Sequence, residues 1–147
     1  MKLPEQLKGC RGAVIDTMLL IYLFENHEKY GGVVEWLLQR AEAGNFQGLI
    51  TPVTMAEILV KPLRNGRNDL ADIYRQAFVN AENIKLCEFT CKTGAMAGAL
   101  RAKYGLPLPD MFQAACALEH GGVLITNDVG LRKISDIHVV ILSEIKS

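Results

Sequence analysis

Four acidic residues that could do chemistry are far apart in the chain, yet each falls where an apolar run meets a helical segment. They are Asp16, Glu57, Asp110 and Asp128. Asp16 lies between an apolar run ending in Ile15 and a second one, where a carboxylate without a partner is costly to desolvate. Several converging carboxylates also repel one another, and a divalent cation removes that repulsion. Oxygen ligands without histidine or paired cysteine suit Mg²⁺ or Mn²⁺ rather than zinc.

The chemistry that such a cluster supports is phosphoryl transfer. Bound cations neutralise the non-bridging phosphate oxygens, lower the pKa of a bound water and stabilise the leaving oxygen, so no histidine or cysteine nucleophile is required. His27, His120 and His138 are expected at a helix start, a helix end and a strand edge, and we interpret all three as structural or exposed. The pattern therefore favours metal-dependent hydrolysis of phosphodiester bonds.

Each acid also has an ordinary structural explanation. Asp16, Asp110 and Asp128 could be capping or turn residues, and Glu57 could be an exposed helix residue. Taken one at a time, these explanations compete well with a metal site. The four acids together, all near strand-to-helix junctions, favour the metal site.

The elements that must position these acids alternate between short apolar strands and helices. The expected strands are residues 13–15, 49–50, 84–89, 123–125 and 139–141. The expected helices are residues 17–24, 28–43, 51 to about 62, 69–81, 91–104 and 110–120. Gly94 and Gly98 suggest close packing of helix 91–104 on a neighbour. Alternating strands and helices indicate one α/β domain over residues 1–147, with a parallel sheet covered on both faces. Ligands bind outside the carboxyl ends of such strands, where all four acids are expected.

Composition limits the function further. Half of the residues are hydrophobic, 22% are charged and the formal net charge is zero, so nucleic acid could be held only by local patches and metal. The four cysteines form no CxxC pair and are expected to be free thiols, as in a reducing cytoplasm. No signal-peptide pattern is seen, and the longest apolar run, residues 18–24, is too short to cross a bilayer. We expect a soluble, cytoplasmic protein with no membrane partner.

The segments around the acids resemble a PIN domain, in particular the small VapC-type toxin ribonucleases of prokaryotic toxin–antitoxin pairs. The resemblance covers residues 14 to about 141. It is carried, in order, by Val14-Ile15-Asp16-Thr17, by Thr51-Pro52-Val53-Thr54-Met55-Ala56-Glu57, by Leu108-Pro109-Asp110 with Ala114-Ala115-Cys116-Ala117 behind it, and by Leu124-Ile125-Thr126-Asn127-Asp128. No single piece is highly specific, but four pieces in this order and spacing are.

The resemblance implies a three-layer α/β/α fold with a five-stranded parallel sheet. It also implies Mg²⁺- or Mn²⁺-dependent endoribonuclease activity on RNA, a small antitoxin partner and a homodimer, which we expect to form through the first two helices and residues 69–81. Asp16, Glu57 and Asp110 match the family's central metal-binding acids, and Asp128 matches a fourth, less uniform one. Thr126 matches a supporting hydroxyl; Thr17 and Asn127 are expected to support the site as well. The segment after Asp128 lacks the acidic-aromatic continuation of many relatives, which puts the role of Asp128 in doubt.

Basic residues close to these motifs are the expected contacts for the RNA backbone. They are Lys61, Arg64, Arg67, Arg101, Lys103, Arg132 and Lys133. Any one of them could equally belong to a solvated face.

Other functions on a similar sheet fit less well. A haloacid-dehalogenase-type phosphatase requires a second aspartate two positions after the first, where this chain has Met18. A response-regulator receiver requires an acidic pair ahead of its phosphorylated aspartate, and none precedes Asp16. Two alternatives remain open: a PIN-like domain that binds RNA or protein without cutting, and a housekeeping RNA-processing nuclease.

Overall fold

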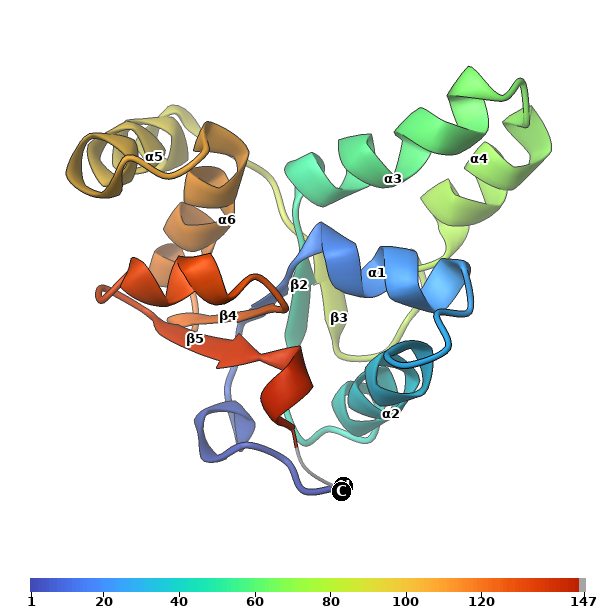
Figure 1. The fold of residues 1–147 in the computed structure, drawn as a ribbon, viewed down its shortest axis with the longest axis horizontal. Helices are drawn as coiled ribbons and strands as arrows, with labels where there is room; N and C mark the ends of the chain where they lie inside the picture. Colours follow the sequence, from blue (N-terminus) through green and yellow to red (C-terminus); the bar gives the residue numbers. More distant parts are fainter. Residues whose placement is uncertain (146–147) are drawn as a thin grey trace.

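A five-stranded parallel sheet, in the order β3-β2-β1-β4-β5, forms the centre of the computed structural model, which describes residues 1–145 (Figure 1). The strands are β1 (Ala13–Ile15), β2 (Gly48–Ile50), β3 (Ile84–Leu86), β4 (Val123–Thr126) and β5 (His138–Ile141). Every neighbouring pair is parallel. From β1 the chain continues to β2 and β3 on one side, then crosses to β4 and β5 on the other. The strand order therefore reverses beside β1, which is where parallel sheets bind ligands.

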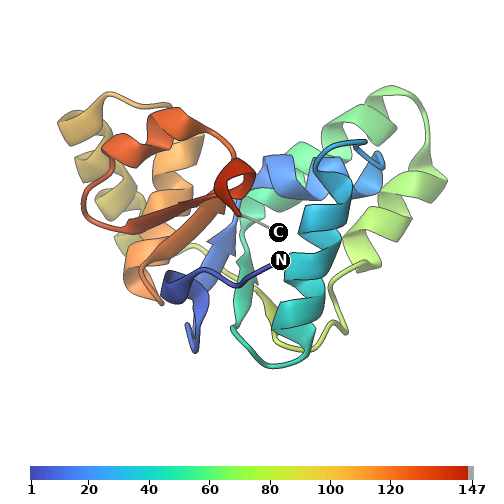
Figure 2. The same ribbon diagram turned by 60° about the horizontal axis from the view of Figure 1, so that its bottom comes forward.

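Helices cover both faces of this sheet. They are α1 (Thr17–Phe24), α2 (Gly31–Glu42), α3 (Pro52–Arg64), α4 (Asn68–Gln76), α5 (Cys91–Tyr104) and α6 (Leu108–Glu119), with short 3₁₀ helices η1 (Glu5–Leu7), η2 (Val129–Lys133) and η3 (Leu142–Glu144). Figure 2 shows α5 and α6 on one side of the sheet and α1 and α2 on the other. The expected three-layer α/β/α fold is confirmed. Within residues 1–145, none of the helices has the length and apolar character needed to span a bilayer.

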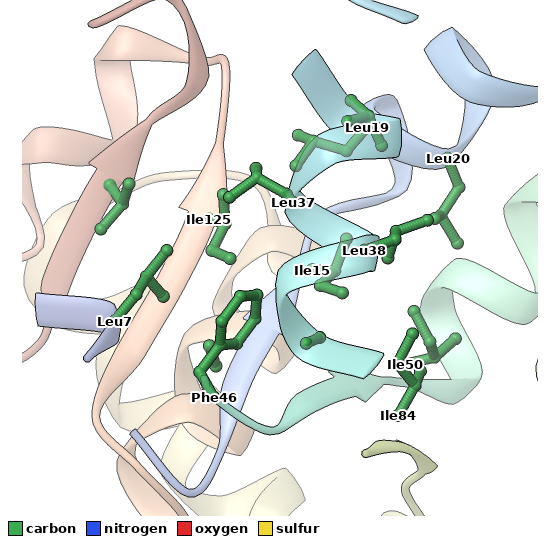
Figure 3. Packing of buried hydrophobic residues seen from close by; sticks show 14 of the residues in the cluster. Leu7, Ile15, Leu19, Leu20, Leu37, Leu38, Phe46, Ile50, Ile84 and Ile125 are labelled. Atoms are coloured by element: carbon green, nitrogen blue, oxygen red, sulfur yellow. The ribbon is translucent and has the colours of Figure 1, made fainter. Parts of the chain in front are cut away.

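The two faces of the sheet carry separate hydrophobic clusters. On one face Ile15 and Ile125 pack with Leu19 of α1 and Leu37 of α2 (Figure 3). On the other face, alternate strand residues such as Val14 pack under α5 and α6. Successive strand residues point to opposite faces, so apolar runs without a polar alternation must be covered on both sides. The short apolar runs predicted these buried strands correctly.

Helix α3 runs through Pro62 to Arg64, although a break near Pro62 was expected. A proline inside a helix loses one hydrogen bond from its missing N–H. Here the loss falls in the last turn, the Pro62 ring is buried, and the Pro62 carbonyl accepts the N–H of Arg67 beyond the helix. The proline is therefore accommodated by packing and by the turn that follows.

Other boundaries also differ from expectation. Helix α2 starts at Gly31 rather than residue 28, because His27 Nδ1 accepts the backbone N–H groups of Lys29 and Tyr30 and holds them in a turn. Helix α4 ends at Gln76 instead of residue 81, and the edge strand β3 ends at Leu86 instead of residue 89.

The small residues of α5 do not pack as predicted. A Cβ atom added at Gly94 or Gly98 would meet nothing within 4 Å. The face of α5 that is buried carries Thr93, Ala97 and Leu100 instead. The expectation of close packing at the two glycines was wrong, because they lie on the outer side of the helix.

Candidate active site

One cavity of about 230 Å³ at the carboxyl edge of the sheet is lined by all four acids singled out in the sequence. Its lining is Asp16, Thr17, Met18, Ile21, Glu57, Asp110 and Asp128. No lysine, arginine or histidine is among these residues, so no protein cation offsets the negative charge there.

Each acid reaches the cavity from the start of a helix or from just inside it. Asp16 follows β1 and caps α1, with Oδ1 accepting the N–H of Thr17 at 2.9 Å. Asp128 follows β4 and caps η2. Asp110 lies in the first turn of α6. Glu57 lies further along α3, in its second turn. Four segments that are remote in sequence thus meet at one edge of the sheet.

Asp16 is the buried member of the group, with only 8% of its surface exposed. Burial raises its pKa above the usual value, and donation from Thr126, from the Thr17 backbone and from Gln113 opposes this rise. The Thr126 hydroxyl donates to Asp16 Oδ2 at 2.7 Å. Both carboxylate oxygens are therefore fixed in place.

Asp110 is half-buried, and its pKa is raised to about 6, first by burial and then by repulsion from Asp16, Asp128 and Glu57. The side-chain hydrogen bonds and ion pairs found among residues 1–145 do not include its carboxylate. The repulsion from three other acids indicates that all four carboxylates act on one another. A nearby cation would offset this repulsion.

The donor set can be tested against a metal ion. Among residues 1–145, no three histidine, cysteine, aspartate or glutamate side chains are close enough together to hold an ion directly. Mg²⁺, however, keeps several waters and is commonly bound through one or two carboxylates together with substrate phosphates. An oxygen-only cavity with uncompensated negative charge therefore fits a hydrated hard cation, and does not fit a site that needs three tight protein ligands.

Buried polar residues that the sequence did not single out support the acids from below. Thr51, Thr54 and Gln113 form a hydrogen-bonded group that continues to Thr17, whose hydroxyl donates to Glu57 Oε1 at 2.7 Å. The sequence did contain a signal for two of these supporting residues. Thr54 lies three residues before Glu57, and Gln113 lies three residues after Asp110. At that spacing the residues share a helix face.

Thr126 and Asn127, both expected to support the site, do different things. Thr126 donates to Asp16 and accepts the backbone N–H of Asp128 at 3.1 Å. Asn127 donates to the Tyr22 hydroxyl at 3.2 Å and accepts the N–H of Ser143 at 3.0 Å. Asn127 thus joins the end of β4 to α1 and η3 rather than contacting an acid.

None of the seven expected RNA-contacting basic residues lines the acid cavity. Lys61 pairs with Glu25, Arg67 with Asp69, Lys103 with Asp136 and Arg132 with Glu144, while Arg101 donates to the carbonyls of Gly105 and Leu106. Exposed pairs of this kind contribute about 0–1 kcal/mol. The basic residues could therefore exchange these partners for a phosphate group at little cost in free energy.

A second hollow, also of about 230 Å³, lies beside the acid cavity between α1, α3 and α4. Its lining is mainly apolar and includes Ile21, Phe24, Leu70 and Tyr74. Glu57 lines both hollows, and Lys61 and Arg67 stand at this one. This apolar groove therefore adjoins the acid cavity at Ile21 and Glu57.

The histidines and cysteines lie elsewhere. His27 caps a turn, His138 starts β5 on the surface, and His120 Nδ1 lies 2.8 Å from the carbonyl oxygen of Cys116. All four cysteines are free, as expected. Neither residue type reaches the acid cavity.

Comparisons with known proteins identify the family and the fold of the chain. A family model described as PIN domain matches residues 13–137. A structure of a toxin–antitoxin complex from Klebsiella pneumoniae is similar at 27% sequence identity and a TM-score of 0.68, over 90% of this chain and 99% of that one. DNA-bound VapBC from Salmonella typhimurium is similar at 16% identity and a TM-score of 0.71, over 90% and 98% of the two chains. FitAcB from Neisseria gonorrhoeae is similar at 18% identity and a TM-score of 0.69, over 90% and 99%. The last two show likeness of fold alone. No curated protein matches the chain in sequence.

Proposed function

This chain belongs to the PIN domain family, and we propose that it is an Mg²⁺- or Mn²⁺-dependent endoribonuclease acting as the toxin of a toxin–antitoxin pair. The observation that carries the proposal is the lining of one cavity by four carboxylates with no protein cation among them. The pKa of Asp110, raised to about 6 first by burial and then by repulsion from the other three acids, supports it further, because such an arrangement is costly without a cation.

In this proposal Asp16, Glu57, Asp110 and Asp128 would hold a hydrated metal ion, through its bound waters where a carboxylate does not reach it directly. When bound, the metal neutralises phosphate oxygens and activates water for attack on phosphorus. The chain's own part is to orient the acids. Thr126 and the Thr17 backbone each occupy one oxygen of Asp16, and Thr17 occupies one oxygen of Glu57. A carboxylate oxygen has more than one acceptor site, so each can still face the cavity.

Basic residues outside the acid cavity would hold the RNA backbone. Lys61, Arg64 and Arg67 lie on or just after α3, and Arg132 and Lys133 lie in η2 directly after Asp128. Arg101 and Lys103 in the last turn of α5 are the more remote members of this set. A cytoplasmic location, where RNA and a reducing environment coincide, belongs to the same proposal.

The central experiment is incubation of the purified chain with total cellular RNA and Mg²⁺ or Mn²⁺, followed by mapping of the new 5′ ends. Asp16→Asn and EDTA should each stop cleavage, and Asp136→Asn, at a surface carboxylate paired with Lys103, should not. Full activity in EDTA would refute metal dependence. Calorimetric Mn²⁺ binding without any cleavage would instead favour a non-catalytic PIN-like domain.

We further propose that an antitoxin segment occupies the apolar groove between α1, α3 and α4. The neighbour from Klebsiella pneumoniae is described as a toxin–antitoxin complex, and this groove leads to Glu57. The product of a small adjacent gene should suppress cleavage when co-expressed. Leu70→Asp should abolish that suppression and leave cleavage intact. Absence of any adjacent inhibitor gene would favour a housekeeping nuclease.

A homodimer through α1, α2 and the α4 region is the remaining part of the proposal. Two large apolar side chains there are strongly exposed, Ile73 by 62% and Val79 by 51%. Burying them against a second copy removes apolar surface from water. Light scattering should give a dimer mass at micromolar concentration, and Ile73→Lys should give a monomer mass. A monomeric wild-type chain would refute the dimer.

A further inference from the structure

A continuous row of hydrogen bonds, buried except for the last one at Glu57, joins three helices beneath the acid cavity. Thr51 Oγ1 donates to Gln113 Oε1 of α6 at 2.5 Å, and Gln113 Nε2 donates to Thr54 Oγ1 of α3 at 2.8 Å. The hydroxyls of Thr54 and Thr17 lie 2.9 Å apart, and Thr17 donates to Glu57 Oε1 at 2.7 Å. The row therefore starts ahead of α3, passes through α6 and α1, and ends on a carboxylate of the site.

The direction of these bonds is fixed by Glu57. An ionised carboxylate only accepts, so the single hydroxyl proton of Thr17 is committed to Glu57. Thr17 must then accept from Thr54, and the Thr54 oxygen must accept from the amide nitrogen of Gln113. If the Gln113 amide were flipped, its Oε1 atom would face Thr54. Thr54 would then have to donate its only hydroxyl proton to Gln113 and could not donate to Thr17. Only one orientation of the Gln113 amide satisfies every member.

Burial makes this arrangement informative. Gln113 is 1% exposed, Thr51 1% and Thr54 0%, and the neighbours of Gln113 on α6 are apolar. Burying an amide costs free energy unless its hydrogen bonds are made, whereas an apolar residue would fill the same volume without that cost. Packing alone therefore does not account for a glutamine at this position.

From these contacts we infer that Gln113 is a positioning residue for the proposed nuclease, fixing Glu57 at the cavity through Thr54 and Thr17. Gln113 also donates to Asp16, so loss of the amide acts on Asp16 directly as well, and substitutions at Thr54 isolate the route to Glu57. The inference rests on the proposed function. Gln113 lies one turn after Asp110 on α6, and Thr54 lies one turn before Glu57 on α3. The bond between Gln113 and Thr54 thus also sets the spacing of the two helices that carry these acids.

The first test is Gln113→Met, which keeps the length of the side chain and removes both the donor and the acceptor. In a folded variant, kcat for RNA cleavage in Mn²⁺ should fall about tenfold or more. KM should change by less, since the basic residues proposed to hold RNA are untouched. Mn²⁺ affinity by calorimetry should fall together with kcat. Ile134→Val, which removes one methyl from the hydrophobic cluster that contains Met111 and Ala114 of α6, is the control and should leave kcat and Mn²⁺ affinity unchanged.

A matched pair at Thr54 separates positioning from packing. Thr54→Val keeps the shape and removes the hydroxyl, whereas Thr54→Ser keeps the hydroxyl and removes a buried methyl. Positioning predicts that the valine variant loses activity and Mn²⁺ affinity as Gln113→Met does, and that serine restores both. A purely structural role predicts that both variants lose stability, serine through the cavity it leaves and valine through the unpaired Gln113 amide, while kcat and Mn²⁺ affinity of the folded variants stay unchanged.

Each outcome decides the inference. An active wild type with an equally active, folded Gln113→Met overturns it, as does a serine variant no better than valine. Should Gln113→Met fail to fold, the Thr54 pair alone decides. A wild-type chain that neither binds Mn²⁺ nor cleaves RNA overturns the proposed function and this inference with it, so the two failures are distinguishable.

Discussion

The two edges of the sheet are built in opposite ways. At the carboxyl edge four acids surround an open cavity. At the amino edge the backbone closes on itself, because the N–H of Gly121, after α6, donates to the carbonyl of Gly12, before β1, at 3.1 Å. A Cβ at Gly12 would lie 2.7 Å from the Cβ of His120, and a Cβ at Gly121 would lie 2.6 Å from the carbonyl oxygen of Gly12. The amino edge is thus a closed edge, packed without room for a methyl group at Gly12 or Gly121. The carboxyl edge is an open edge, where the charges of the four acids repel one another.

The same two elements, β1 and α6, run between these edges. β1 leads from Gly12 to Asp16, and α6 leads from Asp110 towards Gly121. The closed contact at one end therefore helps to fix the distance between two acids at the other. The amino edge is satisfied within the chain, whereas the cavity at the carboxyl edge has four acids and no basic residue in its lining. Substitutions at the two edges should therefore fail in different assays.

The largest effect is expected at the open edge. Asp110→Asn should lower the rate of RNA cleavage about a thousandfold, because removal of one charged metal contact costs several kcal/mol of transition-state stabilisation. Initial rates in Mg²⁺ measure the effect, with circular dichroism to show that the fold is kept. A variant with more than a tenth of the wild-type rate would remove Asp110 from the proposed metal site.

The next largest effect, a loss of stability, is expected at the closed edge. Gly121→Ala should lower the free energy of unfolding by about 3 kcal/mol, since overpacking against backbone atoms cannot be relieved by a side-chain rotation. Urea denaturation measures it. The matched control is Gly98→Ala in α5, where a Cβ meets nothing within 4 Å. That control should be stabilising by about 0.5–1 kcal/mol from helix propensity. Equal stability of the two variants would contradict the closed edge.

The stability of Asp110→Asn in EDTA, which removes divalent cations, tests the repulsion at the open edge. The folded-state pKa of Asp110 is about 6, above its ordinary value, so its stabilising contribution is complete below about pH 4 and is lost as the pH rises through 6. At pH 7 the neutral asparagine should therefore be more stable than wild type by about 1 kcal/mol, a value reduced for solvent screening of this half-exposed group. Thermal unfolding at pH 4 and pH 7 tests the sign.

Added Mg²⁺ provides the counterpart of that experiment. A ligand that binds only the folded state stabilises it by mass action. Saturating Mg²⁺ should therefore raise the melting temperature of wild type and leave Asp110→Asn nearly unchanged, reversing their order. Identical responses of the two proteins to Mg²⁺ would contradict a shared cation at the cavity.

Much of the open edge could be predicted from sequence, and the closed edge could not. Asp16 and Asp128 follow short apolar strands, and the carboxyl ends of parallel strands meet at one edge, so their convergence followed from local pattern and general topology. Gln113 looked like an ordinary helix residue, because its partners Thr51 and Thr54 lie about sixty positions away. The helical pattern on α6 could not reveal which residues of α3 would lie opposite it.

The glycines illustrate the same limit of sequence analysis, here in the prediction of close packing. Gly98 was expected to pack closely on a neighbour and has open space around it, whereas Gly121, for which no close packing was expected, makes the tightest backbone contact of the two. A glycine in sequence indicates only that a side chain is absent. Whether backbone, solvent or a left-handed turn requires that absence depends on the neighbours in space.

The smallest effect is expected for Cys10→Ala at the closed edge. The Cys10 thiol lies 4.0 Å from the carbonyl oxygen of Gly121, at the limit of a hydrogen bond from a weak donor. The unfolding free energy should therefore change by less than about 1 kcal/mol, and the cleavage rate should not change. Urea denaturation of Cys10→Ala beside Gly121→Ala separates the contribution of the thiol from that of the backbone contact. An equal loss of stability in the two variants would mean that the thiol, rather than the contact between the Gly12 and Gly121 backbones, holds the amino edge together. The spacing of Asp16 and Asp110 would then depend on an oxidisable residue.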